Sequence, residues 1–478
     1  MASGITLSAG VRQNLLSLQN TAELMSATQN RLATGKKVNS ALDNPSNFFT
    51  ASSLQSRGND LSSLLDSMAT GIKTLEAADN GITSITKTVE SMQSTLRQAR
   101  QDKSFQTASY SINLGTTPAG TEKLSFSGGS VGSTAIDVGL TNSTMTTAAA
   151  VGTVALADNG KQFTVSDGTT ATADITLATG DTVDDIVTKI NAATTTANNG
   201  IVASNDNGKI KLTSTSNAAI AVANGTTTGG ATVLGFGALA HEAKSVDDVV
   251  SAIGANALLA GKVTASSDGG KLRITNNSLG DLTVGGASSA GVIDGSASTA
   301  DIGGNETRKS LVKQFNELRD QLNKTADDSG YNGVNLLRKD ALKLTFNETG
   351  TSTMEIQVKD SSDQAMAIDA DALDIDSALD ADFNSDDAID AKLAGLGDAL
   401  GTLRSQSSSL GSKLSIVQNR QDFTKSMINT LQTGADGLVL ADSNEEAANL
   451  LALQTRQQLS STALSMAAQA DQAVLRLF

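Results

Sequence analysis

Residues 7–32, LSAGVRQNLLSLQNTAELMSATQNRL, carry apolar side chains at steps of four and three. This spacing is that of a heptad seam, which predicts a helix that packs against other helices. The last twenty residues repeat the pattern, so we expect the two ends of the chain to meet. The expected interface residues of this terminal coiled coil are Leu7, Val11, Leu15, Leu18, Met25, Leu32, Leu459, Met466, Val474 and Leu477.

The two terminal helices should not be stable by themselves. A buried large aliphatic side chain contributes roughly 1.5–3 kcal/mol, so the N-terminal seam contributes on the order of 10 kcal/mol gross. Ordering the backbone costs about 1–2 kcal/mol per residue, which is several times more over a helix of this length. Because isolated helices are marginal in water, we expect these ends to fold fully only when neighbouring copies cover their remaining faces.

The length, net charge and composition of the chain narrow the possible functions. The chain has 478 residues, so several domains are expected. A net charge of −15 argues against nucleic acid or anionic lipid as the main partner. Cysteine is absent and His241 is the only histidine, which excludes disulfides, a cysteine nucleophile and a His-rich metal site.

Nothing in the sequence predicts contact with a membrane. No span of about twenty apolar residues occurs, and residues 1–5 lack the basic and apolar regions of a cleavable secretory signal. If the protein leaves the cell, we expect it to use another route.

Helical periodicity fills both ends of the chain and is replaced by short alternating segments in the middle. The expected fold is α+β and multidomain, with a long antiparallel α-helical coiled-coil rod formed by both termini and a β-rich variable insertion that projects outward. Gly434 and Gly437 should interrupt the last helical region. The expected domains are a terminal inner-core domain of residues 1–40 plus 440–478, a helical rod domain of residues 41–104 plus 306–439 with a β-hairpin near 340–360, and a β-rich outer region of residues 105–305.

The β-rich region contains an internal repeat. TVDDIV at residues 182–187 recurs as SVDDVV at 245–250, and NGKIKLT at 207–213 recurs as GGKLRIT at 269–275. Each copy predicts a capped short helix, a hairpin and a further strand. Two α+β modules are therefore expected at about 163–223 and 226–285.

Two features that suggest metal binding have simpler interpretations. His241 has no second ligand nearby, so we interpret it as a loop histidine. A run of aspartates between residues 369 and 390 lacks the Gly and bidentate Glu of an EF-hand loop, so we interpret it as a solvated connector. No nucleophile–base pair or metal set is recognisable in residues 105–305. The sequence therefore predicts no catalytic residue, no cofactor and no metal.

Several motifs resemble those of bacterial flagellin. NRLATGKKVNSA at residues 30–41 is similar to the family's signature. Residues 79–82 resemble its turn within the long helix, YNGVNLL at 331–337 resembles the segment before its hairpin, and residues 445–478 resemble its C-terminal helix. The resemblance identifies a signature loop at Arg31, Leu32, Gly35, Asn39 and Ser40.

The resemblance implies a secreted structural subunit that polymerises into the extracellular bacterial flagellar filament for swimming motility. Its implied partners are further copies of the chain, an export chaperone, the flagellar type III export apparatus, and hook-associated and cap proteins. Neither nucleic acid nor membrane insertion is implied, and the chain is not expected to be an enzyme. A hook–filament junction protein is the alternative, and an enzyme carried on the filament is a third hypothesis that would need a convergent polar cluster in residues 105–305.

The chain departs from the family at two immune epitopes. Asn44 and Asn47 replace an acidic residue and a glycine of the plant epitope, and Gln98 replaces an arginine of the segment recognised by the animal Toll-like receptor. We predict that purified monomer stimulates either receptor only weakly, because these side chains no longer match the epitopes. A full-strength response in a reporter cell would contradict this.

Overall fold

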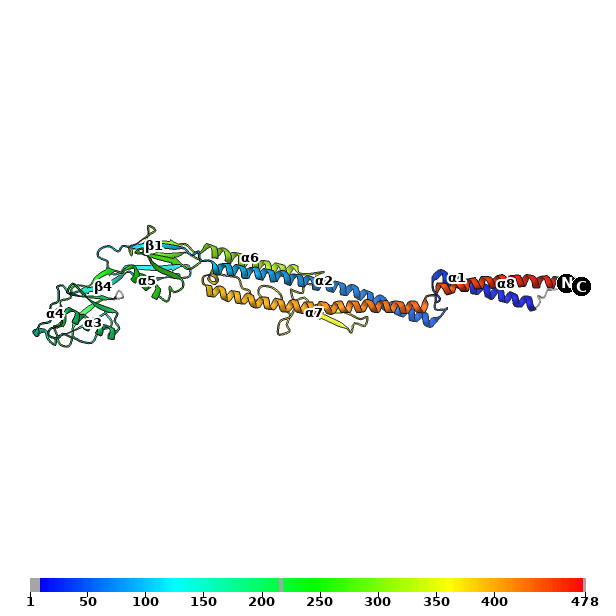
Figure 1. The fold of residues 1–478 in the computed structure, drawn as a ribbon, viewed down its shortest axis with the longest axis horizontal. Coiled ribbons are helices and arrows are strands. Elements are labelled where there is room, and N and C mark those ends of the chain that lie inside the picture. Colours follow the sequence, from blue (N-terminus) through cyan, green and yellow to red (C-terminus); the bar gives the residue numbers. More distant parts are fainter. Residues whose placement is uncertain (1–8, 215–217, 476–478) are drawn as a thin grey trace. The chain divides into compact units, whose positions relative to one another are not determined.

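The computed structural model describes residues 9–214 and 218–475 (Figure 1). They divide into two compact units: residues up to 85, 324–372 and from 402 onward form the first, and residues 86–323 and 373–401 form the second. The five long helices are α1 Ala9–Thr34, α2 Pro45–Gln101, α6 Glu306–Asp328, α7 Asp386–Val439 and α8 Ser443–Leu475.

Helix α2 begins at a well-formed cap. The Asn44 side chain accepts a hydrogen bond from the Asn47 backbone N–H at 3.1 Å, and Pro45 occupies the first helical position, where its missing N–H costs nothing. In the first unit its buried apolar residues recur at helical spacing. They are Ala51, Leu61, Met68, Ile72, Leu75, Ala78, Ile82 and Ile85.

Helix α2 also runs without a break through residues 79–82, where the family resemblance predicts a turn. That expectation is wrong. Gly81 lies in the helix beneath the segment between α6 and the following hairpin. A Cβ at this position would overlap Ser329 and would approach Leu337 Cδ1 to 2.8 Å. The glycine is therefore needed for a close approach between two segments and not for a turn.

Gly434 and Gly437 likewise do not interrupt the helix, since α7 continues to Val439. A helical glycine costs only about 1 kcal/mol. Packing of Ile428 and Leu431 against Leu61 of α2 stabilises this end of α7.

A β-hairpin of β16 Leu342–Thr345 and β17 Thr353–Ile356 belongs to the first unit. Leu344 packs closely on α2, where a Cβ at Gly71 would approach Leu344 Cδ2 to 2.6 Å. Near the turn of the hairpin, Arg57 of α2 forms an ion pair with Glu348 at 2.8 Å.

The β-rich insertion lies in the second unit. Its helices are α3 Val183–Ala197, α4 Gly230–Leu234 and α5 Val246–Ala255. Its strands are β1 Thr107–Ile112, β2 Lys123–Gly128, β3 Gly132–Gly139, β4 Thr141–Thr146, β5 Gln162–Ser166, β6 Ile175–Thr176, β7 Ile201–Asp206, β8 Lys209–Ser214, β9 Ala221–Asn224, β10 Ala240–Ala243, β11 Val263–Asp268, β12 Lys271–Asn276, β13 Leu282–Gly285, β14 Val292–Ile293 and β15 Thr299–Ile302. The sheet orders among the described residues are β11-β12-β1-β14, β10-β4-β8-β7, β15-β13-β2-β3 and β6-β5-β9.

Both copies of the repeat form the capped helix, hairpin and strand that the sequence predicts. Thr182 and Ser245 each accept a hydrogen bond from the backbone N–H three residues later, and the Asp side chain there completes a capping box. The second copy does not form a module within residues 226–285, which corrects the expected bounds. Its core joins strands from residues 107–140 to residues 246–302, while residues 145–236 form a separate core. A hairpin and a single further strand leave unpaired edges, and here β1 and β2 cover them by pairing with β12 and β13.

His241 lies on strand β10 opposite Ser143 and not in a loop, so this expectation was also wrong. Its Nδ1 is 3.5 Å from Ser143 Oγ, and its ring covers Gly120. Among the described residues no group of three His, Cys, Asp or Glu side chains could hold a metal. No helix in the described part of the chain is long and apolar enough to cross a lipid bilayer.

The two glycines of α2 give a test of this packing. Gly58 has open space where a Cβ would lie, whereas Gly81 has none. Gly58→Ala should raise the free energy of unfolding by about 0.5–1 kcal/mol because alanine loses less backbone entropy. Gly81→Ala should lower it by about 1–3 kcal/mol through overpacking. Denaturant unfolding of the monomer, followed by circular dichroism, measures both, and shifts of the same sign would contradict the packing described.

Candidate functional site

Helices α1 and α8 pack against each other in antiparallel orientation (Figure 1). Arg31 near the end of α1 pairs with Glu446 in the first turn of α8, with Nη1 and Oε1 3.4 Å apart. The backbone N–H of Ala441 donates to Gly35 O at 2.9 Å, so the segments that follow α1 and precede α8 are also joined. The first and last helices of the chain therefore form one helical pair.

Each helix places one heptad seam in this pair. On α1 the buried or half-buried positions along the seam are Val11, Asn14, Leu18, Thr21, Met25 and Thr28, and Ala22 beside Thr21 is half-buried as well. On α8 they are Glu446, Leu450, Leu453, Gln457, Ser460, Leu464 and Ala467, and Ala463 beside Leu464 is half-buried as well. Both sets advance by three and four residues, which is the spacing of helices that pack along a seam.

A second set of large apolar side chains on the same helices is exposed. On α8 these are Leu451, Leu459 and Met466, of which Leu459 is 67% exposed. At 3.6 residues per turn, this stripe lies on the face of α8 roughly opposite Leu453 and Leu464. On α1 the exposed set is Leu15, Leu16, Leu24 and Leu32. We call these seven residues the outer apolar faces.

The interface residues expected from the sequence are thus divided between two surfaces. Val11, Leu18 and Met25 lie at the seam within the chain. Leu15, Leu32, Leu459 and Met466 are exposed, although Leu32 follows Met25 by seven residues and so lies on the same side of α1. Leu7 and Leu477 fall outside the described residues, and Val474 is described only as part of the helix α8.

Sequence analysis missed Thr21, Thr28 and most of the α8 seam. Thr21 is buried although it is polar, because its hydroxyl donates to Ser17 O at 2.7 Å within the helix. Extending the heptad spacing back from Leu464 to Glu446 would have found the α8 positions.

The signature loop joins the helical pair to α2. Gly35 ends α1 with a φ of 68°, a left-handed conformation that favours glycine. The backbone N–H groups of Asn39 and Ser40 both donate to Asp43 Oδ2 at 2.9 Å. The hydrogen bonds from Ser40 and Asn39 hold the pKa of the Asp43 carboxyl below its ordinary value. The loop is therefore a formed turn at neutral pH.

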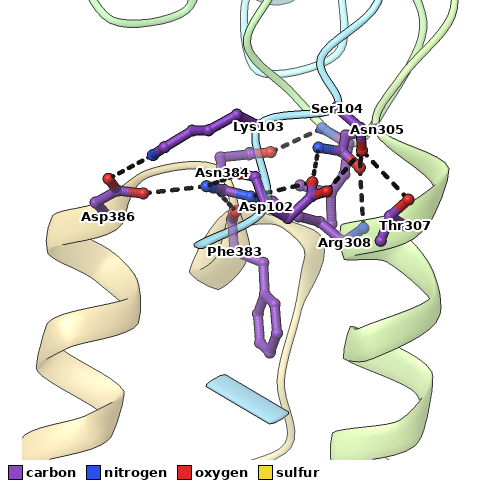
Figure 2. Close-up of polar contacts among 10 residues, drawn as sticks. Asp102, Lys103, Ser104, Asn305, Thr307, Arg308, Phe383, Asn384 and Asp386 are labelled. Carbon is purple, nitrogen blue, oxygen red and sulfur yellow. Dashed lines mark hydrogen bonds and ion pairs between the residues drawn. The ribbon is translucent and has the colours of Figure 1, made fainter. Parts of the chain in front are cut away.

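A separate polar cluster lies where the β-rich insertion leaves the helices, and we call it the joint. Figure 2 shows Arg308, in the first turn of α6, surrounded by Asp102 and by the segment that carries Phe383 and Asp386. The guanidinium donates to Phe383 O at 2.8 Å, to Asp102 O at 3.1 Å and to Asp386 Oδ1 at 3.0 Å. It also lies 4.8 Å from the centre of the Phe105 ring, within range of a cation–π interaction.

Arg308 is only 1% exposed, so its charge must be compensated locally. Burial alone would raise the pKa of Asp102, but hydrogen bonds from Ser104 and Asn305 and the charge of Arg308 hold it below the ordinary value. A hydrogen bond from Lys103 and the nearby Arg308 likewise lower the pKa of Asp386. Both carboxylates are therefore charged at neutral pH and balance the buried cation.

The joint ties together four segments of the second unit. Asn305 donates to Asp102 and caps α6 by accepting from Arg308 N at 3.0 Å. Asn384 accepts from Leu279 N at 2.9 Å, which adds a loop of the insertion. The end of α2, the start of α6, the segment before α7 and the base of the insertion therefore share one network (Figure 2).

The helical regions at the two ends of the chain match known protein families. Residues 9–114 match the bacterial flagellin N-terminal helical region, and residues 393–478 match the bacterial flagellin C-terminal helical region. Both ends of the chain are therefore similar to bacterial flagellins. Helices α1 and α8 and the signature loop lie inside the matched regions, and most of the insertion lies outside them.

Several curated flagellins are similar to part of the chain. Flagellin A of Rhizobium meliloti (strain 1021) is 43% identical over 90 residues, which are 19% of this chain and 23% of the relative. Flagellin FljM of Caulobacter vibrioides is 29% identical over 171 residues, 35% of this chain and 59% of the relative. A flagellin of Brucella melitensis is 31% identical over 189 residues, 38% of this chain and 64% of the relative. The chain therefore spans less than two thirds of the length of these relatives.

Replacing the buried cation tests the joint. Arg308→Met should lower the free energy of unfolding of the second unit by about 2–3 kcal/mol, because two backbone carbonyls lose their donor and two carboxylates lose their counter-charge. Lys309 is half-buried and pairs with the exposed Glu306 at 3.4 Å, so Lys309→Met should change it by less than about 1 kcal/mol. Thermal and denaturant unfolding near pH 7 measure both variants.

The loss of unfolding free energy caused by Arg308→Met should become smaller as the pH is lowered. Because both carboxyl pKa values are lowered from their ordinary 3.8, the joint contributes its full stability above pH 3.8 and loses it as the pH falls through the lowered values. The difference between Arg308→Met and the unchanged chain should therefore shrink below pH 3.8. A difference that grows on acidification would contradict the assignment.

Proposed function

We propose that this chain is a flagellin, a structural subunit that polymerises into the extracellular bacterial flagellar filament. The observation that carries the proposal is the pair of outer apolar faces on α1 and α8. On α8 the face opposite the packed one still exposes large aliphatic side chains, and on α1 Leu16 and Leu24 point away from the seam and are exposed as well.

Further copies of the chain are the occupants that fit these faces. Burying a large aliphatic side chain contributes roughly 1.5–3 kcal/mol, so three on α8 alone contribute several kcal/mol to each contact. The exposed residues of α1 and α8 are different sets, so a contact between them joins unlike surfaces. Such a heterologous contact does not close into a dimer and can repeat as an open helical polymer.

The net charge sets the condition for this assembly. Copies that each carry −15 repel one another over a Debye length of about 10 Å at 0.1 M salt. Apolar contact at the terminal helices supports association only when this repulsion is screened. Added salt should therefore favour the polymer.

Other partners follow from the family and not from contacts within the chain. We extend the proposal to an export chaperone on the C-terminal helix, the flagellar type III export apparatus, and hook-associated and cap proteins. Weak stimulation of the plant and animal flagellin receptors belongs to the same proposal. The relatives are named flagellins, which favours a filament subunit over a hook–filament junction protein.

Truncating the outer face of α8 tests the proposal. Leu459→Ser should strongly reduce sedimentable polymer, because it removes a large side chain from the proposed contact. Leu379→Ser is a matched control, since Leu379 is 66% exposed but lies in the acidic connector. Ultracentrifugation and electron microscopy measure the polymer, and equal yields from the two variants would overturn the assignment of the α8 face.

A further inference from the structure

The turn between α1 and α2 presents an apolar side chain to solvent. Leu42 is 94% exposed, the largest exposed fraction of any large apolar side chain among the described residues. Phe49, in the first turns of α2, is also exposed. We call Leu42 and Phe49 the turn patch.

The turn that carries Leu42 is held in place by its polar neighbours. Asp43 Oδ2 accepts hydrogen bonds from the Asn39 and Ser40 backbone N–H groups, and Asp43 N donates to Ser40 O at 3.2 Å. The Leu42 N–H itself donates to Ser40 Oγ at 3.3 Å. Leu42 is therefore displayed on an ordered turn, and little conformational entropy would be lost on binding.

The turn is also fixed to the other end of the chain. Lys37 N donates to Val439 O at 2.8 Å, the Lys37 side chain donates to Gly437 O at 3.2 Å, and Val38 is buried. The turn patch is thus continuous, through Gly35 and Ala441, with the helical pair that carries the outer apolar faces.

A second exposed apolar pair lies on helix α7 of the same unit. Ile416 and Phe423 are seven residues apart and so share one face of the helix. The buried residues Val417 and Thr424 mark the side of α7 that faces the core. Ile416 and Phe423 therefore lie on a flank of the helix, and Gln418 lies roughly 200° around it on the other flank.

We propose that the turn patch of one copy docks on Ile416 and Phe423 of a second copy. The inference rests on the proposed function, because it supplies a second contact between subunits. Outside α1 and α8, the large exposed apolar residues described in the first unit are Leu42 and Phe49 of the turn patch, Tyr331, Ile416, Phe423 and Leu440. A contact between the turn patch and α7 joins unlike surfaces and so matches an open polymer, whereas a contact of the turn patch with itself would close into a dimer.

Cross-linking tests the pairing directly, because the chain has no cysteine. Leu42→Cys and Phe423→Cys proteins are mixed, assembled and treated with a short bifunctional maleimide. Mixing two single-cysteine proteins ensures that a covalent dimer between them joins different copies. We expect such dimers from this mixture and only background from Leu42→Cys mixed with Gln418→Cys.

The energetic contribution is measured separately with Leu42→Ser. The monomer should keep its unfolding temperature, since Leu42 makes almost no contact within the chain. The critical concentration for assembly should rise at least about tenfold, equivalent to about 1.4 kcal/mol.

The outcomes separate this inference from the proposed function. Polymer that forms with an unchanged critical concentration in Leu42→Ser, or with no cross-link above the Gln418 control, overturns the docking and leaves the filament proposal intact. Unchanged protein that forms no polymer under any salt condition overturns the proposed function itself.

Discussion

Helix α8 is apolar on two opposite faces, and the chain can cover only one of them. A single partner helix, α1, occupies the side that carries Leu453 and Leu464, and the side that carries Leu451, Leu459 and Met466 is left to solvent. A helix with this distribution cannot reach its lowest free energy as part of an isolated two-helix pair. This constraint explains why the terminal helices are assigned to assembly and not to a core that the monomer completes.

The joint has a different role from the terminal helices. It places a buried arginine at the point where two crossings of the chain enter the insertion, and its ligands come from segments nearly 300 residues apart in sequence. A polar network of this kind specifies one arrangement, because a misplaced partner would leave a buried charge uncompensated. Most of the insertion lies outside the matched family regions, and the joint provides a fixed base for it within the second unit.

The sequence predicted the long helices, the hairpin and the capped helices of the repeat, because each has a strong local signal. It identified the terminal helices as packing elements but did not distinguish the residues that pack within the chain from those that stay exposed. Leu15 and Leu32 were grouped with Leu18 and Met25, since all are apolar and close to heptad spacing, although Leu15 and Leu32 are the more exposed, at 41% and 38%. Threonine at positions 21 and 28 of the seam gives no apolar signal at all.

Features that depend on distant segments could not be predicted. Gly81 reads locally as a turn, and only the approach of Ser329 and Leu337 shows why a glycine lies within a helix. The bounds of the second module depend on β1 and β2, which the repeat does not include. Arg308 resembles any surface arginine of an amphipathic helix until Asp102 and Phe383 are brought beside it.

Hydrogen exchange of the backbone amides tests the central claim most directly. Amides of α1 and α8 are compared in the monomer and in sedimented polymer, with the strands of the insertion as an internal reference. The account predicts that α1 and α8 exchange rapidly in the monomer and at least tenfold more slowly in the polymer (about 1.4 kcal/mol), while the insertion changes little. Equal protection of α1 and α8 in both states would contradict it.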